Sequence, residues 1–368
     1  MFIYNHKKWP ELNWNSDQLI ELLAKVRHLQ GKLIGKLDAV GFDLKNEAHL
    51  ESLSQDVIKS SEIEGEILDD HQVRSSIARR LGLDIGGLVE SDRNVNGVVE
   101  MILDATQNFN EPLTTERLFS WHAALFPSGR KGMQKIIIGD WRDDSTGPMQ
   151  VVSGPMGRER VHFEAPAHQR IPREMDRFLK WFNSETQEDP VLKAAKAHLW
   201  FVTIHPFEDG NGRIARAITD LMLSRAESQP QKFYSMSAQI RNERKAYYEI
   251  LESTQKGDND ITQWMNWFLN CLLNAIDNSE STVRKVTEKH HFWNEHKNTP
   301  FNPRQIKTLN RLFSDFFGKL TTSKWAKINK CSQDTALRDI QDLVKKNVLK
   351  KQSGGGRSTS YEVIIPKD

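Results

Sequence analysis

The chain has 368 residues, of which 38% are hydrophobic and 27% are charged. This composition is typical of globular proteins and excludes a collagen-like or wholly disordered chain, and the length favours two or three domains. The sequence has no run of about 18 apolar residues and no apolar stretch after its first basic pair, so we expect a soluble, cytoplasmic protein without a membrane segment. The two cysteines, Cys271 and Cys331, exclude a disulfide framework and are expected to be packing residues.

The net charge of +2 is unevenly distributed along the chain. Residues 301–368 contain 14 Lys and Arg against 6 Asp and Glu, which gives this segment +8 and leaves −6 on the residues before it. A basic C-terminal segment favours a polyanionic partner such as DNA. Lysines that are simply solvated would give the same excess, so charge alone leaves both interpretations open.

Most of the chain has the apolar spacing of helices, which predicts a mainly α fold. The first stripe runs from Leu19 to Leu29 and follows Asn15 and Ser16, which are suitable caps. Further helices are expected at 50–63, 94–106, 114–125, 174–183, 190–204, 214–225, 243–256 and 261–291.

One interval departs from the helical pattern. Residues 149–153 and 160–163 have β-type sequences on either side of the Gly-Pro-Met-Gly turn at 154–157, which predicts a β-hairpin. Such a hairpin on a helical body is either a surface ribbon or a flap over a site. The residues themselves leave both possibilities open.

The basic segment has its own pattern. A polar linker is expected at 294–303, followed by helices at 304–317, 323–329 and 332–346 and by strands at 349–352 and 361–365. This order predicts a winged helix-turn-helix, with Ser332 capping the recognition helix and Gly354 to Gly356 at the tip of the wing. It would bind DNA, or it would be a protein-docking or dimerising module. The expected domains are 1–108, 109–293 and 301–368.

The most informative stretch is IHPFEDGNGRIAR at 204–216. Its glycines form a tight polar turn before an apolar helix, where free backbone N–H groups and the helix dipole favour a phosphate. Arg213 and Arg216 share one face of that helix and can both bind polyphosphate oxygens. Asp209 suits Mg²⁺, and His205 can accept a hydroxyl proton near neutral pH. The set indicates transfer of a phosphorus group to a hydroxyl; the alternative is a capped helix junction with a buried histidine.

The same string resembles the Fic-domain signature, HPFx[DE]GNGRxxR, at every specified position. Residues 113–127 and 196–204 resemble the Fic helices before the motif, and the resemblance spans about 110–254. It implies a Fic helical core that transfers AMP from ATP, with Mg²⁺, to a Ser, Thr or Tyr hydroxyl of a target protein or of the chain itself. A helical N-terminal extension and a homodimer would also be expected.

The resemblance also implies roles for individual residues. His205 would be the catalytic base, Phe207 would hold the loop, and Asp209 would bind Mg²⁺. The implied nucleotide-binding residues are Gly210, Asn211, Gly212, Arg213, Ile214, Ala215, Arg216 and, in an adenine pocket, Tyr247 and Tyr248, which ordinary helix packing would also explain. The hairpin would be a flap that holds the target by β-strand addition, through Met149, Gln150, Val151, Val152 and Ser153.

A second resemblance concerns regulation. The sequence SSEIEG at 60–65 matches the inhibitory pattern [ST]xxxE[GN] of Fic proteins, with Ser60, Glu64 and Gly65 at its specified positions. Ser60 and Glu64 lie one helical turn apart, and Gly65 can end the helix. Glu64 would pair with Arg216 and deny it to the γ-phosphate. Otherwise Glu64 is a solvated charge at a helix end.

Other interpretations remain open. Within enzymes, the reaction would be removal of AMP or transfer of another nucleotide or phosphate group. In another class, the chain would be a transcription regulator that senses nucleotide. His198 is expected to be a core residue or a support of the site, and His290, His291 and His296 are expected on a solvated helix rather than at a zinc site.

Overall fold

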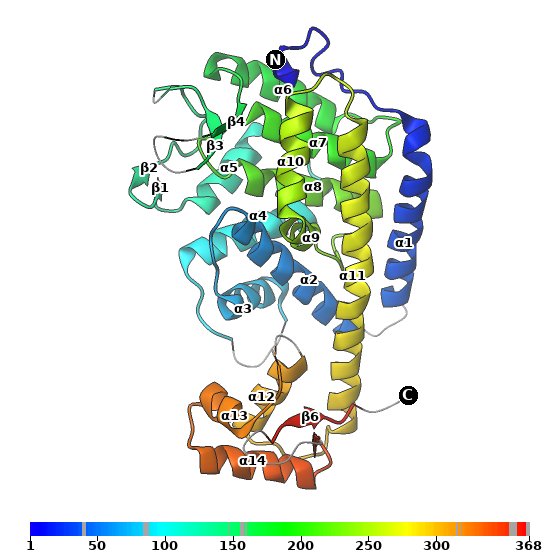
Figure 1. The fold of residues 1–368 in the computed structure, drawn as a ribbon, viewed down its shortest axis with the longest axis vertical. Helices are drawn as coiled ribbons and strands as arrows, with labels where there is room; N and C mark the ends of the chain where they lie inside the picture. The colour runs from blue at the N-terminus through cyan, green and yellow to red at the C-terminus, as the bar shows by residue number, and fades with distance from the viewer. Residues whose placement is uncertain are drawn as a thin grey trace. The chain divides into compact units, whose positions relative to one another are not determined.

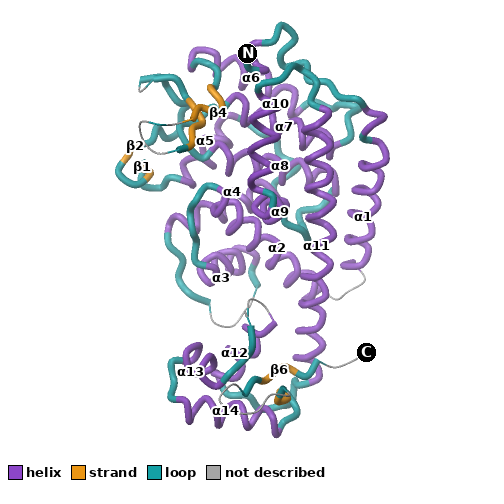
Figure 2. Tube along the Cα trace, in the orientation of Figure 1, coloured by secondary structure: helices purple, strands orange, loops and turns teal. Residues whose placement is uncertain are grey.

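The computed structural model describes residues 1–38, 42–83, 88–145, 147–154, 158, 160–313, 316, 318–352 and 359–365. It confirms the mainly helical fold, and the strands of these described residues form small hairpins (Figures 1 and 2). The chain forms two compact units, Met1–Ser279 and Glu280–Asp368. Within the described ranges, no helix is both long enough and apolar enough to cross a membrane.

The helices before the basic segment follow the predicted order with two additions, and the last of them, α11, continues from the first unit into the second. Their bounds are α1 Ile20–Asp38, α2 Phe42–Ile63, α3 Asp70–Leu81, α4 Arg93–Gln107, α5 Thr115–Leu125, α6 Ile171–Asn183, α7 Pro190–Ile204, α8 Asn211–Glu227, α9 Met236–Asn242, α10 Arg244–Gln255 and the long α11 Thr262–Glu295. The sequence analysis missed α3 and α9. Helix α3 is mostly polar and buries only a narrow stripe that includes Val73, Ile77 and Ala78, too little to give a clear periodic signal.

Helix α8 is the centre of the first unit. It packs against α2, α4, α5, α7 and α9 (Figure 1). Every residue of α7 from Val191 to Ile204 is buried, because this helix is covered on all sides and its sequence is correspondingly apolar. The turn between α7 and α8 is therefore held by two fully packed helices.

A buried ionic cluster attaches α2 to α8. Lys232, Asp56 and Asp220 are each at most 1% exposed, and the Lys232 ammonium pairs with both carboxylates. Removing Lys232 would leave both buried carboxylates without their cation, which is strongly destabilising. Asp56 lies one turn before Ser60 on α2, and Asp220 lies one turn after Arg216 on α8. The cluster therefore sets the register between the end of α2 and the start of α8.

The predicted hairpin is present. Strands β3 Gln150–Ser153 and β4 Arg160–Glu164 pair antiparallel, with a register shift between Val151 and Val152. Glu252 of α10 holds β4 through Arg160 at 2.9 Å and His162 at 2.6 Å. The turn residues Pro155, Met156 and Gly157 lie outside the described residues. A smaller hairpin, β1 Arg130–Lys131 and β2 Gln134–Lys135, precedes it.

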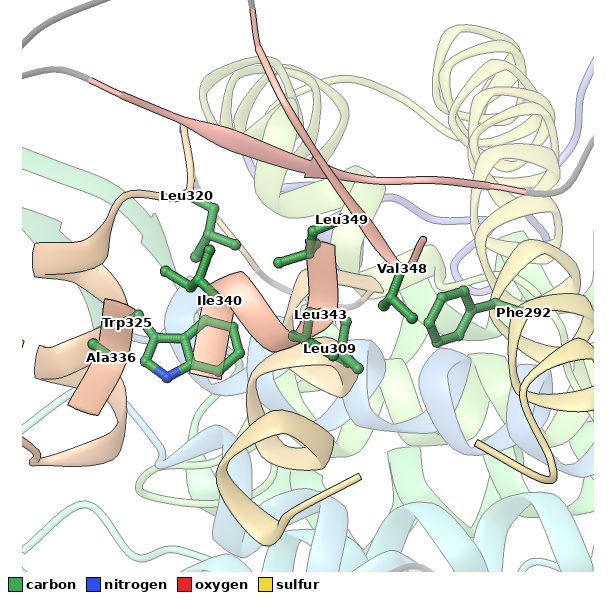
Figure 3. Close-up of a cluster of buried hydrophobic side chains, with 9 residues drawn as sticks. All are labelled: Phe292, Leu309, Leu320, Trp325, Ala336, Ile340, Leu343, Val348 and Leu349. Carbon is green, nitrogen blue, oxygen red and sulfur yellow. The ribbon is translucent and has the colours of Figure 1, made fainter. Parts of the chain in front are cut away.

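The second unit contains the elements expected of the basic segment. These are α12 Pro303–Phe313, α13 Thr322–Asn329, α14 Gln333–Lys345 and the hairpin of β5 Leu349–Lys351 and β6 Tyr361–Val363. Ser332 caps α14 as expected, by accepting from the Thr335 N–H. The glycines at 354–356 lie outside the described residues. Figure 3 shows the core of this unit, formed by Phe292, Leu309, Leu320, Trp325, Ala336, Ile340, Leu343, Val348 and Leu349.

Candidate nucleotide site

The loop between α7 and α8 is shaped by two left-handed residues. His205 ends α7 with φ 53° and ψ 58°, and Gly210 precedes α8 with φ 79°. A Cβ atom on Gly210 would lie 3.1 Å from the Phe126 ring, so both the backbone angle and the space require glycine. Gly210 has no side chain to cap α8. The first N–H groups of the helix are therefore available to an anion, as the sequence predicts.

The Asn211 side chain closes this loop. Its Oδ1 accepts from the Phe207 N–H at 3.0 Å, and its Nδ2 donates to the Phe207 carbonyl at 2.7 Å. The Phe207 ring is fully buried and stacks on His122, with ring centres 4.2 Å apart. Asn211 thus fixes the loop with both polar atoms of its side chain. Phe207 holds the loop inward.

His205 is positioned and kept neutral by its surroundings. Removal from water lowers the pKa of its imidazole to about 4, and the charge of Arg142 acts in the same direction. Its Nδ1 lies 3.3 Å from the Val202 carbonyl, which can only accept, so Nδ1 holds the proton and Nε2 is free to accept one. Arg142 donates to the His205 carbonyl at 2.8 Å, and its own N–H donates to the Pro206 carbonyl at 2.9 Å.

Arg216 is bound to the end of α2. Its guanidinium donates to the Ser60 hydroxyl at 2.8 Å, to the Ser60 carbonyl at 2.9 Å and to Glu64 Oε1 at 2.8 Å. Arg216 is 2% exposed. Burial alone would lower its pKa, but the adjacent Glu64 carboxylate raises it. The structure therefore brings together the residues of the two sequence motifs.

The Glu64 carboxylate also covers the start of α8. A Cβ atom on Gly212 would collide with Glu64 Oε1. Gly212 is in the first turn of α8, whose N–H groups form the predicted phosphate seat. The carboxylate therefore lies close to where a phosphate oxygen would bind.

Two further ion pairs at the motif were not predicted. Arg213, 2% exposed, donates to Glu66 Oε2 at 2.7 Å and lies over the Phe126 ring. Asp209 pairs with Lys131 of β1 at 2.5 Å. No sequence pattern pointed to Lys131, which is distant from Asp209 in the chain, whereas Glu66 lies only two residues after Glu64.

Asp209 fits a magnesium ion that arrives with a polyphosphate. Its carboxylate is partly exposed, and Mg²⁺ is commonly held by one or two carboxylates together with substrate phosphates. Within the described ranges, no group of three or more His, Cys, Asp or Glu is placed to hold a metal ion without such a ligand. Asp209 is thus suited to bind an ion together with a polyphosphate. In this structure the charge of its carboxylate is neutralised by Lys131.

The two tyrosines of the expected adenine pocket have different environments. Tyr247 is 2% exposed, and its hydroxyl donates to His198 Nε2 at 2.8 Å. The Thr219 hydroxyl donates its proton to the Ala215 carbonyl, so its oxygen accepts from His198 Nδ1. His198 therefore has its proton on Nδ1, and its Nε2 is the acceptor. His198 and Tyr247 are therefore core residues. Tyr248 is 38% exposed, and the guanidinium carbon of Arg244 lies 5.4 Å from the centre of its ring.

The remaining predicted residues divide between the core and the flap. Ile214 and Ala215 are fully buried, and the Ile214 N–H donates to the Gly210 carbonyl at 3.0 Å, so neither side chain faces a ligand. On the flap, Val152 and Val161 are opposite each other and are 47% and 42% exposed. Strand β3 pairs only with β4 among the described strands, so its outer edge can accept another strand.

The environment of His205 gives a direct expectation. In a carbon-13 and proton NMR titration of histidine-labelled chain, the His205 ring signal should stay at its neutral position down to about pH 4, because burial opposes the imidazolium. A His205→Gln variant assigns the signal. A midpoint near 6.5, the usual histidine value, would contradict the described environment.

Comparison with known proteins identifies relatives of the two sequence regions that contain these motifs. The Fic/DOC family matches residues 112–223, and a domain of unknown function (DUF4172) matches residues 2–83, which include Glu64 and Glu66. The chain is 24% identical over 273 residues to a protein adenylyltransferase Fic of Culex quinquefasciatus, covering 68% of this chain and 48% of that protein. It is 25% identical over 241 residues to the protein adenylyltransferase Fic of Drosophila melanogaster, covering 62% of this chain and 42% of that protein. The chain thus spans about half the length of these curated relatives.

Solved structures show the same fold. A Fic family protein from Desulfovibrio desulfuricans G20 is 19% identical with a TM-score of 0.53, covering 95% of this chain and 97% of that one. A Fic domain containing signaling protein from Bacteroides thetaiotaomicron VPI-5482 is 21% identical with a TM-score of 0.53, covering 71% and 97%. The predicted resemblance is confirmed: this chain contains a Fic/DOC domain at residues 112–223.

Proposed function

We propose that the chain transfers AMP from ATP to a hydroxyl of a protein. The observation that carries the proposal is the neutral imidazole of His205, whose free Nε2 belongs to the same loop as the uncapped start of α8. Two buried arginines follow on the first turns of this helix. The relatives named protein adenylyltransferase support the same chemistry.

The residues have complementary roles in this reaction. His205 Nε2 accepts the proton of the target hydroxyl, and the hydroxyl oxygen forms a bond to the α-phosphorus. The bond between the α-phosphorus and the bridging oxygen to the β-phosphate breaks, and pyrophosphate leaves. The backbone N–H groups at Gly210 to Gly212 and the guanidinium groups of Arg213 and Arg216 stabilise the negative charge. Asp209 would hold Mg²⁺, which neutralises phosphate charge when bound.

Binding of the other reaction partners uses neighbouring elements. Tyr248 offers its exposed face to the adenine, whereas Tyr247 supports it from the core. The outer edge of β3, Met149 to Ser153, holds an extended segment of the target by backbone hydrogen bonds. Glu252 keeps β4 attached to α10, so the flap has a fixed base while its edge stays available.

Removing the base separates chemistry from binding. In His205→Ala, transfer of label from α-phosphate-labelled ATP should fall to background, while calorimetry should show ATP binding at near wild-type affinity, because the imidazole acts on the hydroxyl rather than on the phosphates. Full labelling by a pure His205→Ala preparation would contradict the mechanism.

We also propose that Glu64 inhibits this activity. Its carboxylate occupies Arg216 and covers Gly212, so ATP would bind without its γ-phosphate contact and with its α-phosphate misaligned. The Ser60 hydroxyl and carbonyl hold the same guanidinium. The end of α2 therefore acts as an internal competitor of the nucleotide.

Releasing Arg216 should activate the chain. Glu64→Gly should raise self-labelling by at least about tenfold, the equivalent of about 1.4 kcal/mol of barrier. Adding Arg216→Ala should cancel this gain, because the released partner is then missing. Equal labelling by wild type and Glu64→Gly would exclude autoinhibition through this contact while leaving the transferase proposal intact.

The second unit favours an additional function, binding of DNA. Its basic side chains are exposed on the helix-turn-helix elements and the hairpin: Lys324, Lys327, Lys330, Arg338, Lys345, Lys350 and Lys351. These cations would contact the phosphate backbone of the DNA, and the capped start of α14 would enter its major groove. The charge of +8 on residues 301–368 supports this assignment.

The salt dependence of binding tests this assignment. Binding of the full chain to duplex DNA should weaken steeply with added salt, by about one unit of log affinity per unit of log salt for each phosphate contacted. Exchanging Lys327 and Lys330 for Glu should reduce the affinity and leave AMP transfer unchanged. Absence of binding at low salt, or association that does not depend on salt, would exclude a DNA-binding role.

A further inference from the structure

The ion pair between Glu66 and Arg213 lies outside the inhibitory pattern, which ends at Gly65. The pair joins Glu66 Oε2 to a guanidinium nitrogen at 2.7 Å. Arg213 is 2% exposed, whereas the Glu66 side chain is 38% exposed. A guanidinium removed from water requires an anionic partner, and the described structure supplies Glu66. Glu66 holds one nitrogen of this guanidinium, Nη1, whereas Nε has no hydrogen-bond partner in the described structure.

Gly65 allows both carboxylates to reach α8. Its φ of 84° lies in the left-handed region, and the Glu66 N–H then donates back to the Ser61 carbonyl at 3.0 Å. The chain folds back after Ile63, so Glu64 and Glu66 contact guanidinium groups that are three residues apart on α8. Each buried arginine of the motif is therefore neutralised by its own carboxylate.

We propose that Glu66 is a second internal competitor of the nucleotide and acts on Arg213 as Glu64 acts on Arg216. This inference rests on the proposed binding of ATP at the motif and extends it. A polyphosphate that enters the site exchanges two carboxylates for its own oxygens. Removal of Glu64 alone releases only Arg216, and Arg213 stays occupied until Glu66 is also displaced.

Calorimetry with Mg-ATP tests the proposal without turnover, in full-length chain carrying His205→Ala. Adding Glu66→Gln should tighten ATP binding by about fivefold, the effect of freeing one partly exposed charge-assisted contact. Combining it with Glu64→Gly should give a larger gain than either change alone. Glu66→Lys should act in the same direction, because it removes the carboxylate and repels Arg213.

Three controls separate competition from a general change in charge. Glu51→Gln removes the same charge from α2, where Glu51 pairs with Arg74 at 3.1 Å, and should leave the affinity unchanged. Glu66→Gln should not tighten binding of AMP, which has no β- or γ-phosphate. Arg213→Ala should abolish the gain from Glu66→Gln, because the released donor is then absent.

The outcomes distinguish this inference from the proposed function. If Glu64→Gly tightens ATP binding but Glu66→Gln behaves like Glu51→Gln, the role of Glu66 is wrong and the nucleotide site stands. An equal gain for AMP and ATP would also overturn competition at Arg213. If no variant binds ATP, including the one that lacks both carboxylates, the nucleotide assignment fails and this inference fails with it.

Discussion

The burial of Arg213 and Arg216 on one turn of α8 is the constraint on which the site depends. Two guanidinium groups that are each 2% exposed must have anionic partners, because an unpaired buried charge costs several kcal/mol. The end of α2 supplies these partners as Glu64 and Glu66. Each guanidinium is therefore neutralised by a carboxylate, although Arg213 Nε and Arg216 Nη1 have no hydrogen-bond partner among the described residues.

The rest of the first unit keeps this arrangement in place. The buried contacts of Lys232 attach α2 to α8 one turn away from Arg216. Asn211 and Phe207 hold the loop after α7, and Arg142 supports the backbone of His205. The loop at 205–210 is therefore held in one conformation by the protein itself. On this account, control of the site comes from exchange of charged partners rather than from folding of the loop.

The sequence predicted the local features of the site. The string at 204–216 indicated a turn at a helix start, and SSEIEG indicated the carboxylate that meets Arg216. Distant pairings that no motif specifies were not predictable: nothing in the sequence places Lys131 beside Asp209. Spacing also did not show which of the adjacent Tyr247 and Tyr248 faces the core. Helix α3 was missed because its buried stripe is narrow.

The crystal structure of the chain with both Glu64→Gly and Glu66→Gln, grown with Mg-ATP, tests the central claim most directly. The account predicts that the phosphates contact the backbone at Gly210 to Gly212, that Arg213 and Arg216 bind phosphate oxygens, and that the metal ion contacts Asp209. A nucleotide bound elsewhere, or phosphates that leave both arginines without contact, would contradict it.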